Sequence, residues 1–126
     1  PSHAVAMTIN PGDWVFVDIH ETATNQWLIT IVDGAQVFQN SFTYASSHTS
    51  AEWIVEEPSL ASGREFPQPL SNSTNFSRMS AIANGQKAIP TQLSPQASVI
   101  VGPRGQLRAS PSPLGNDGAS FSVAVQ

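Results

Sequence analysis

Residues 14–44 read WVFVDIHETATNQWLITIVDGAQVFQNSFTY, and this stretch decides the fold class. Three runs rich in Val, Ile, Phe, Thr and Trp follow one another, and these residue types are enriched in β-strands. Turn residues at 22–25 separate the first two runs, and Asp33-Gly34, a strong hairpin signal, separates the last two. We therefore expect an antiparallel meander. Its strands are expected at 14–20, 27–32 and 37–44.

The rest of the chain continues the same pattern, and no window shows a convincing helical period. Further strands are expected at 6–9, 52–56, 76–82, 98–101 and 121–125. Polar or Pro- and Gly-rich loops are expected at 46–50, 58–69 and 110–118. Short strands that recur about every ten residues are typical of sandwiches and barrels. We therefore predict an all-β fold, a two-sheet antiparallel sandwich that forms one domain over residues 1–126.

The composition excludes several classes of function. Of the 126 residues, 11% are charged, and the formal net charge is −4. One lysine and four scattered arginines make no basic stripe, so no nucleic-acid partner is expected. The chain has no cysteine, which excludes disulfides and a thiol nucleophile. No apolar run is long enough to span a bilayer, so no membrane partner is expected. A polar surface with few charges tolerates acid, which suits a secreted, extracellular protein.

The segment AEWIVEEP, residues 51–58, carries the candidate chemistry. Side chains alternate along a strand, so Trp53 and Val55 would share one face, with Glu52 and Glu56 on the other, about 7 Å apart. Glu57 follows Glu56 and would point the opposite way. The simpler interpretation is a half-exposed strand whose acids face water. The alternative places a carboxylate on the floor of a cleft, where it acts as a general base on a water molecule.

The six residues AEWIVE resemble the signature of the glutamic peptidases of family G1, the eqolisins. Weaker likeness at 9–13, 42–44 and 118–123 extends the resemblance over essentially the whole chain. The resemblance implies a jelly-roll-like sandwich of the concanavalin A-like type and an acid-acting endopeptidase of polypeptide substrates. It further implies that Glu56 is the catalytic glutamate, with Glu52 and Glu57 as supporting acids, and that no metal or other cofactor is needed.

The sequence also departs from the family pattern. The catalytic pair of the family is a Glu and a Gln, and the strand that carries the Gln lies upstream of everything seen here. No glutamine of this chain matches that motif, so the catalytic Gln is expected outside the chain and the sandwich is expected to be incomplete. A complementary N-terminal chain, or a homodimer through exposed sheet edges, is the expected partner. The Phe that commonly follows the catalytic Glu by two residues is Pro58 here.

Other candidate sites remain open at this point. The three histidines are dispersed, although His20 with Asp18 and Glu21 could form an opportunistic metal site. Three tryptophans could form a sugar-stacking platform or pack in the core. The alternative function is therefore a non-catalytic β-sandwich module that binds carbohydrate or protein, or an inactive relative of the peptidases.

Overall fold

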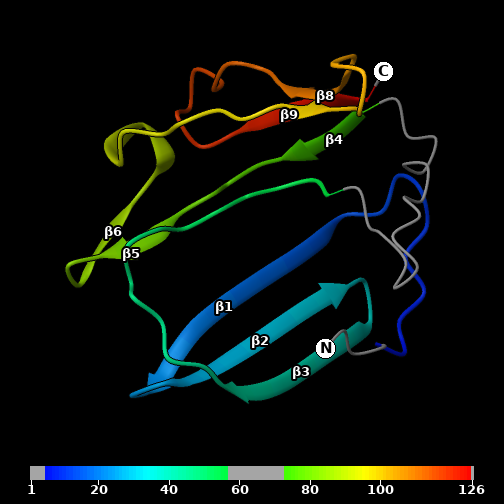
Figure 1. Cartoon of the computed structure of the whole chain (residues 1–126). Coiled ribbons are helices and arrows are strands. Elements are labelled where there is room, and N and C mark those ends of the chain that lie inside the picture. The colour runs from blue at the N-terminus through cyan, green and yellow to red at the C-terminus, as the bar shows by residue number, and fades with distance from the viewer. Residues whose placement is uncertain (1–4, 57–72, 126) are drawn as a thin grey trace. The chain divides into compact units, whose positions relative to one another are not determined.

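The computed structural model of the protein describes residues 5–56 and 73–125. The chain divides into two compact units, Pro1–Ser50 and Ala51–Gln126, which are described separately here. Within the described residues the secondary structure is antiparallel β-sheet, with a single 3₁₀ turn at Pro90–Gln92 and no α-helix (Figure 1). None of the helical structure there is long and apolar enough to cross a membrane.

The first unit is built on the predicted meander. Strands β1 (Val15–Ala23), β2 (Gln26–Asp33) and β3 (Gln36–Thr43) form one antiparallel sheet in the order β1-β2-β3 (Figure 1). Two residues separate each pair of strands, and Asn25 and Gly34 supply the positive φ angles, 60° and 55°, that such tight turns require. The prediction of three strands in residues 14–44 is therefore confirmed.

The two faces of this sheet differ in chemistry. In the register between β1 and β2, Val17 and Ile19 stand opposite Ile31 and Ile29, which makes one face strongly apolar. Phe38 and Phe42 of β3 belong to the same face, because they pair with Ile31 and Trp27. The opposite face carries Asp18 and His20 of β1, and polar side chains of β3 that include Gln39, Ser41 and Thr43.

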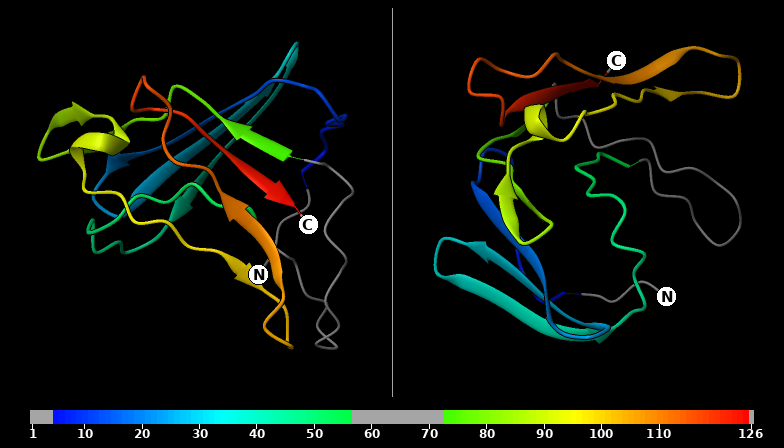
Figure 2. Two further views of the ribbon diagram at one scale, coloured as in Figure 1. Left: turned by 90° about the horizontal axis from the view of Figure 1, so that it is seen from above. Right: turned by 90° about the vertical axis from the view of Figure 1, so that its left-hand side faces the viewer.

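The second unit contains two sheets. Strands β4 (Ser73–Phe76), β7 (Ile100–Val101), β8 (Leu107–Pro111) and β9 (Phe121–Val125) form an antiparallel sheet in the order β4-β9-β8-β7. Strands β5 (Ala81–Ala83) and β6 (Gln86–Ala88) form a separate hairpin, which can be followed in both views of Figure 2. Its turn, Asn84-Gly85, has positive φ at both residues, as a two-residue hairpin loop requires.

The best-buried apolar side chains lie in the second unit. Ala109 of β8 is 1% exposed and Val123 of β9 is 7% exposed. Met79 and Ala119, which are also buried, are joined through the backbone, because the Met79 N–H donates to the Ala119 carbonyl over 3.0 Å. The loop that leads from β4 is therefore fastened to the loop that leads into β9.

Several strand predictions were wrong. Residues 6–9 and 52–56 belong to none of the sheets in the described part of the chain. The strand expected at 76–82 is broken, because β4 ends at Phe76 and β5 begins at Ala81, with Arg78 at a φ of 55° between them. A positive φ at a residue other than glycine is incompatible with a continuous strand. The loop expected at 58–69 lies outside the described residues.

Candidate functional site

The segment Ala51–Glu56 shows the alternation that the sequence predicts. Trp53 and Val55 are half-buried, whereas Glu52, Ile54 and Glu56 are exposed, with Ile54 at 55%. The two described carboxylates therefore lie on the side of the segment that faces away from its packed side chains. Glu57, predicted as a supporting acid, lies outside the described residues.

The expected strand at 52–56 has no partner strand in the described chain, and this corrects the sequence prediction. The alternating burial of residues 51–56 follows from the order of their apolar and polar side chains, and this order is visible in the sequence. A β-ladder also needs a second backbone at hydrogen-bonding distance, and such a partner is a tertiary feature. The residue types of a strand are thus present here without its backbone pairing.

The glutamines of the first unit are engaged in structural hydrogen bonds. Gln26 Nε2 donates to Thr43 Oγ1 over 3.1 Å, and Gln39 Nε2 donates to Thr30 Oγ1 over 3.0 Å, so both amides tie neighbouring strands together. Gln36 holds the chain that precedes β1: its Nε2 donates to the Thr8 carbonyl over 2.8 Å. These contacts give the three amides a structural role in the first unit.

His20, Asp18 and Glu21, considered above as an opportunistic metal site, do not come together. His20 Nδ1 contacts the Asp18 carboxylate, because residues two apart on a strand share a face. Glu21 lies on the opposite face of β1, where it contacts His48. Among the described residues, no three histidine, aspartate or glutamate side chains come close enough together to hold a metal ion.

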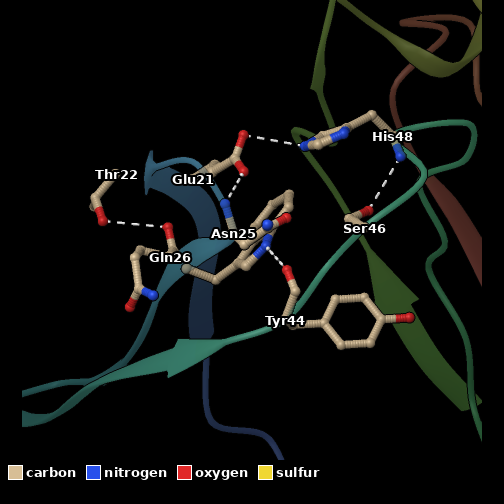
Figure 3. A network of polar contacts seen from close by, with 8 residues as sticks. Glu21, Thr22, Asn25, Gln26, Tyr44, Ser46 and His48 are labelled. Atoms are coloured by element: carbon tan, nitrogen blue, oxygen red, sulfur yellow. Dashed lines mark hydrogen bonds and ion pairs between the residues drawn. The ribbon is translucent and has the colours of Figure 1, made fainter.

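A polar cluster around Glu21 was missed by the sequence analysis. One carboxylate oxygen of Glu21 accepts the Asn25 N–H over 2.7 Å, and the other lies 3.0 Å from His48 Nε2 (Figure 3). The imidazole of His48 also stacks on Trp27, with ring centroids 5.6 Å apart. Trp27 Nε1 donates to the Tyr44 carbonyl over 2.9 Å. The cluster thus fastens the chain after β3 to the turn between β1 and β2.

No local signal in the sequence could have revealed this cluster. Glu21 and His48 are 27 residues apart, and neither belongs to a recognisable motif. His48 also has a φ of 56°, a conformation that is uncommon for residues other than glycine. Its backbone N–H donates to Ser46 Oγ over 3.1 Å, which supports the bend (Figure 3).

The second unit has a shallow, open hollow of about 310 Å³. Its apolar part is the stacked pair Phe76 and Phe121, whose ring centroids are 4.8 Å apart. Serine, asparagine, proline and glycine complete the lining: Asn75, Ser77, Ser112, Pro113, Gly115, Ser120 and Ser122. None of the described residues that line this hollow is a carboxylate, and none belongs to the segment 51–56.

The comparison with family sequence models decides the classification. The model of the peptidase A4 family matches residues 1–120. The chain belongs to the peptidase A4 family, the glutamic peptidases of family G1. The resemblance drawn from the signature AEWIVE is therefore confirmed, and the chain is placed among peptidases.

The comparison with solved structures gives the same fold. The crystal structure of aspergilloglutamic peptidase from Aspergillus niger aligns with a TM-score of 0.77 at 20% sequence identity. The alignment covers 96% of this A4-family chain and 71% of the Aspergillus chain. The predicted antiparallel β-sandwich class is thereby confirmed. That the chain forms one domain stays a prediction. No curated protein sequence matches the chain.

Proposed function

We propose that this A4-family chain is the larger part of a secreted, acid-acting endopeptidase in which Glu56 is the general base. The ionised carboxylate takes a proton from a water molecule, and the water attacks the carbonyl carbon of a peptide bond. The Glu56 carboxyl group, now protonated, then donates a hydrogen bond to the tetrahedral intermediate. No metal or cofactor takes part in this scheme.

The observation that carries the proposal is the arrangement of residues 51–56 in a chain of this family. Trp53 and Val55 are half-buried and fix the segment, while Glu56 is exposed on the opposite side, where an extended peptide can reach it. Glu52 shares that side and stands two positions earlier. We assign Glu52 and Glu57 supporting roles, through the negative charge that they place beside the general base.

The second catalytic group of the proposal is a glutamine amide outside these 126 residues. Stabilising the developing oxyanion requires a hydrogen-bond donor held close to the position that the oxygen will occupy. The side chains of Gln26, Gln36 and Gln39 are already hydrogen-bonded within the first sheet, which argues against a role for them in catalysis. The complete active site is therefore expected to need an additional segment of polypeptide.

Glu56→Gln tests the proposal. The chain, together with the polypeptide that supplies the glutamine, would be assayed on an acid-denatured protein at about pH 3 to 4 in the presence of pepstatin. Loss of the general base should lower kcat by roughly 10² to 10⁴-fold with an intact fold. Asp117→Asn, which neutralises an exposed carboxylate in the loop before β9, is the control and should leave activity unchanged. Full activity of Glu56→Gln would refute the assignment.

A non-catalytic module that binds carbohydrate is the second candidate. It is favoured by Trp14, which is 80% exposed, but Trp27 and Trp53 are half-buried and do not extend a platform. Sugar-binding surfaces rely on exposed aromatic faces. Retention on a polysaccharide resin that is lost on Trp14→Ala, together with no cleavage at any acid pH, would favour this function over the peptidase.

A further inference from the structure

The sequence contains two triplets of the type that accepts an N-linked glycan, Asn-X-Ser/Thr with X other than proline. They are Asn72-Ser73-Thr74 and Asn75-Phe76-Ser77, and neither has a part in the proposed catalysis. Asn72 lies outside the described residues, whereas Asn75 belongs to strand β4 of the second unit. The fold of the second unit therefore decides whether a glycan fits at Asn75.

The register between β4 and β9 puts Asn75 on the polar face of their sheet, where it pairs with Ser122. Phe76 lies on the opposite face, because successive side chains of a strand alternate. It pairs with Phe121 there and stacks on its ring. The same face carries Val123, which is 7% exposed. The side chain of Asn75 therefore points away from the packed residues of this sheet, and this follows from the register within the second unit alone.

The triplet ends where the chain leaves the sheet. Among the described residues, β4 is an outer strand of its sheet, and Ser77 follows the last residue of its ladder. The chain then bends at Arg78, which has a φ of 55°. Asn75 and Ser77 both line the shallow, open hollow of about 310 Å³. A bulky group joined to Asn75 thus has room beside the strand.

The amide group of Asn75 is also free of competing contacts. Among the described residues its side chain makes no hydrogen bond, whereas Asn10 donates to Asp13 and Asn40 accepts the Ser41 N–H. Replacing one amide N–H of Asn75 by a bond to a sugar therefore breaks no hydrogen bond in that part of the chain. It also leaves no buried partner unsatisfied, which is the costly consequence of removing a polar group.

We propose that Asn75 is an acceptor site for an N-linked glycan. The donor is an oligosaccharide carried on a lipid pyrophosphate, and the amide nitrogen attacks its anomeric carbon. The new C–N bond forms, the C–O bond to the pyrophosphate breaks, the lipid pyrophosphate leaves, and the amide nitrogen loses one proton. Ser77 supplies the hydroxyl that the triplet requires. Because this transfer takes place in a secretory compartment, the site rests on the secreted character that belongs to the proposed function.

Production in a eukaryotic host that secretes the chain behind a leader peptide of its own tests the site. Treatment with a peptide-N-glycanase, which removes N-linked glycans and converts the attached asparagine to aspartate, should lower the mass of the secreted protein. In ¹⁸O-labelled water the enzyme marks the converted residue, and mass spectrometry of peptides should find the mark at position 75. Since the host supplies the leader, the result does not depend on how the chain is secreted in nature.

Matched variants locate the glycan. Ser77→Ala removes the triplet and should be secreted without the glycan on Asn75, whereas Ser77→Thr keeps a hydroxyl at that position and should retain it. Asn75→Gln should lose the glycan, and Asn72→Gln should keep it. Glu56→Gln should carry the glycan as the wild type does, so failure of the proposed catalysis and failure of this inference can be told apart.

Three results would overturn the inference. The first is secreted wild-type protein whose mass the glycanase leaves unchanged. The second is a glycan that Asn75→Gln retains and Asn72→Gln loses, which would assign it to the other triplet. The third is loss of the glycan in Ser77→Thr as well as in Ser77→Ala, which would mean that the hydroxyl at this position does not decide the transfer.

Discussion

The two units of this peptidase-family chain use the same strand chemistry but differ in how well their sheets are covered. The buried side chains of Met79, Ala109, Ala119 and Val123 all lie in the second unit. The first unit has the longer strands, and its β2 includes the run WLITIV, yet those residues are only half-buried. Burial is therefore set by what packs against a strand, since residue type alone would give the opposite order.

The comparison shows where each unit derives its stability. In the second unit, β8 lies between β7 and β9, so that Ala109 has a strand on each side and almost no exposure. In the first unit, β2 also has a strand on each side, yet its residues Trp27–Asp33 are only half-buried. We therefore expect cross-strand pairs, and polar contacts such as those around Glu21, to contribute a larger share of the stability of the first unit.

The largest expected effect concerns the centre of the second sheet. Ala109→Asp places a carboxylate where the wild-type residue is 1% exposed, and burying a charge without a partner strongly destabilises a protein. We expect the free energy of unfolding to fall by about 3 to 5 kcal/mol, measured by urea denaturation. In the first unit, Val17→Asp in the 126-residue chain should change it by less than about 0.5 kcal/mol, because that side chain is already exposed.

These two substitutions test the difference in burial between the two units. If Val17→Asp destabilised the isolated chain as much as Ala109→Asp, the apolar face of β1 would be covered within the 126 residues. A substitution of Val37, which is exposed to a similar degree on the other face, controls for the change of charge alone.

An intermediate effect is expected for the cluster that fastens the chain after β3. His48→Ala removes both the contact with Glu21 and the stack on Trp27, and should destabilise the first unit by about 1 kcal/mol. A double-mutant cycle with Glu21→Gln isolates the ion pair, whose coupling should be within about 0.2 to 1 kcal/mol. A coupling of zero would mean that stacking on Trp27 is the main contribution of His48.

The smallest effect is expected at Asp117 and depends on pH. The Ala119 N–H, and after it the Ser120 hydroxyl, donate hydrogen bonds that hold the pKa of Asp117 below its ordinary value. A carboxylate with a lowered pKa stabilises the fold above the unfolded pKa, and this stabilisation disappears as the pH falls through the folded pKa. Asp117→Asn should therefore be slightly destabilising at pH 7 and neutral in strong acid, as measured by thermal unfolding at both pH values.

A result of the opposite sign would contradict this account. If Asp117→Asn were more destabilising in acid than at pH 7, the hydrogen bonds to Ala119 and Ser120 would not depend on the carboxylate charge. The side chain would then act in the loop before β9 mainly through its shape.

The meander of the first unit could be predicted because its determinants are local. The alternation in residues 14–44, and the turn residues Asn25 and Gly34, suffice to define three strands and their order. Prediction failed at β4 and β5, where a bend at Arg78 interrupts a stretch of suitable strand residues. The Met79 N–H bonds the Ala119 carbonyl there, 40 residues away in sequence, and such a contact leaves no local pattern.

The sequence by itself determined the strand chemistry, the alternation around Glu56 and the family, since each depends on residues close together in the chain. The tertiary structure decided which stretches found a partner strand, which apolar faces became covered, and that Glu21 meets His48. These features depend on backbones and side chains that come together only on folding. For the same reason, residues 51–56 can have the residue pattern of a strand without pairing as one.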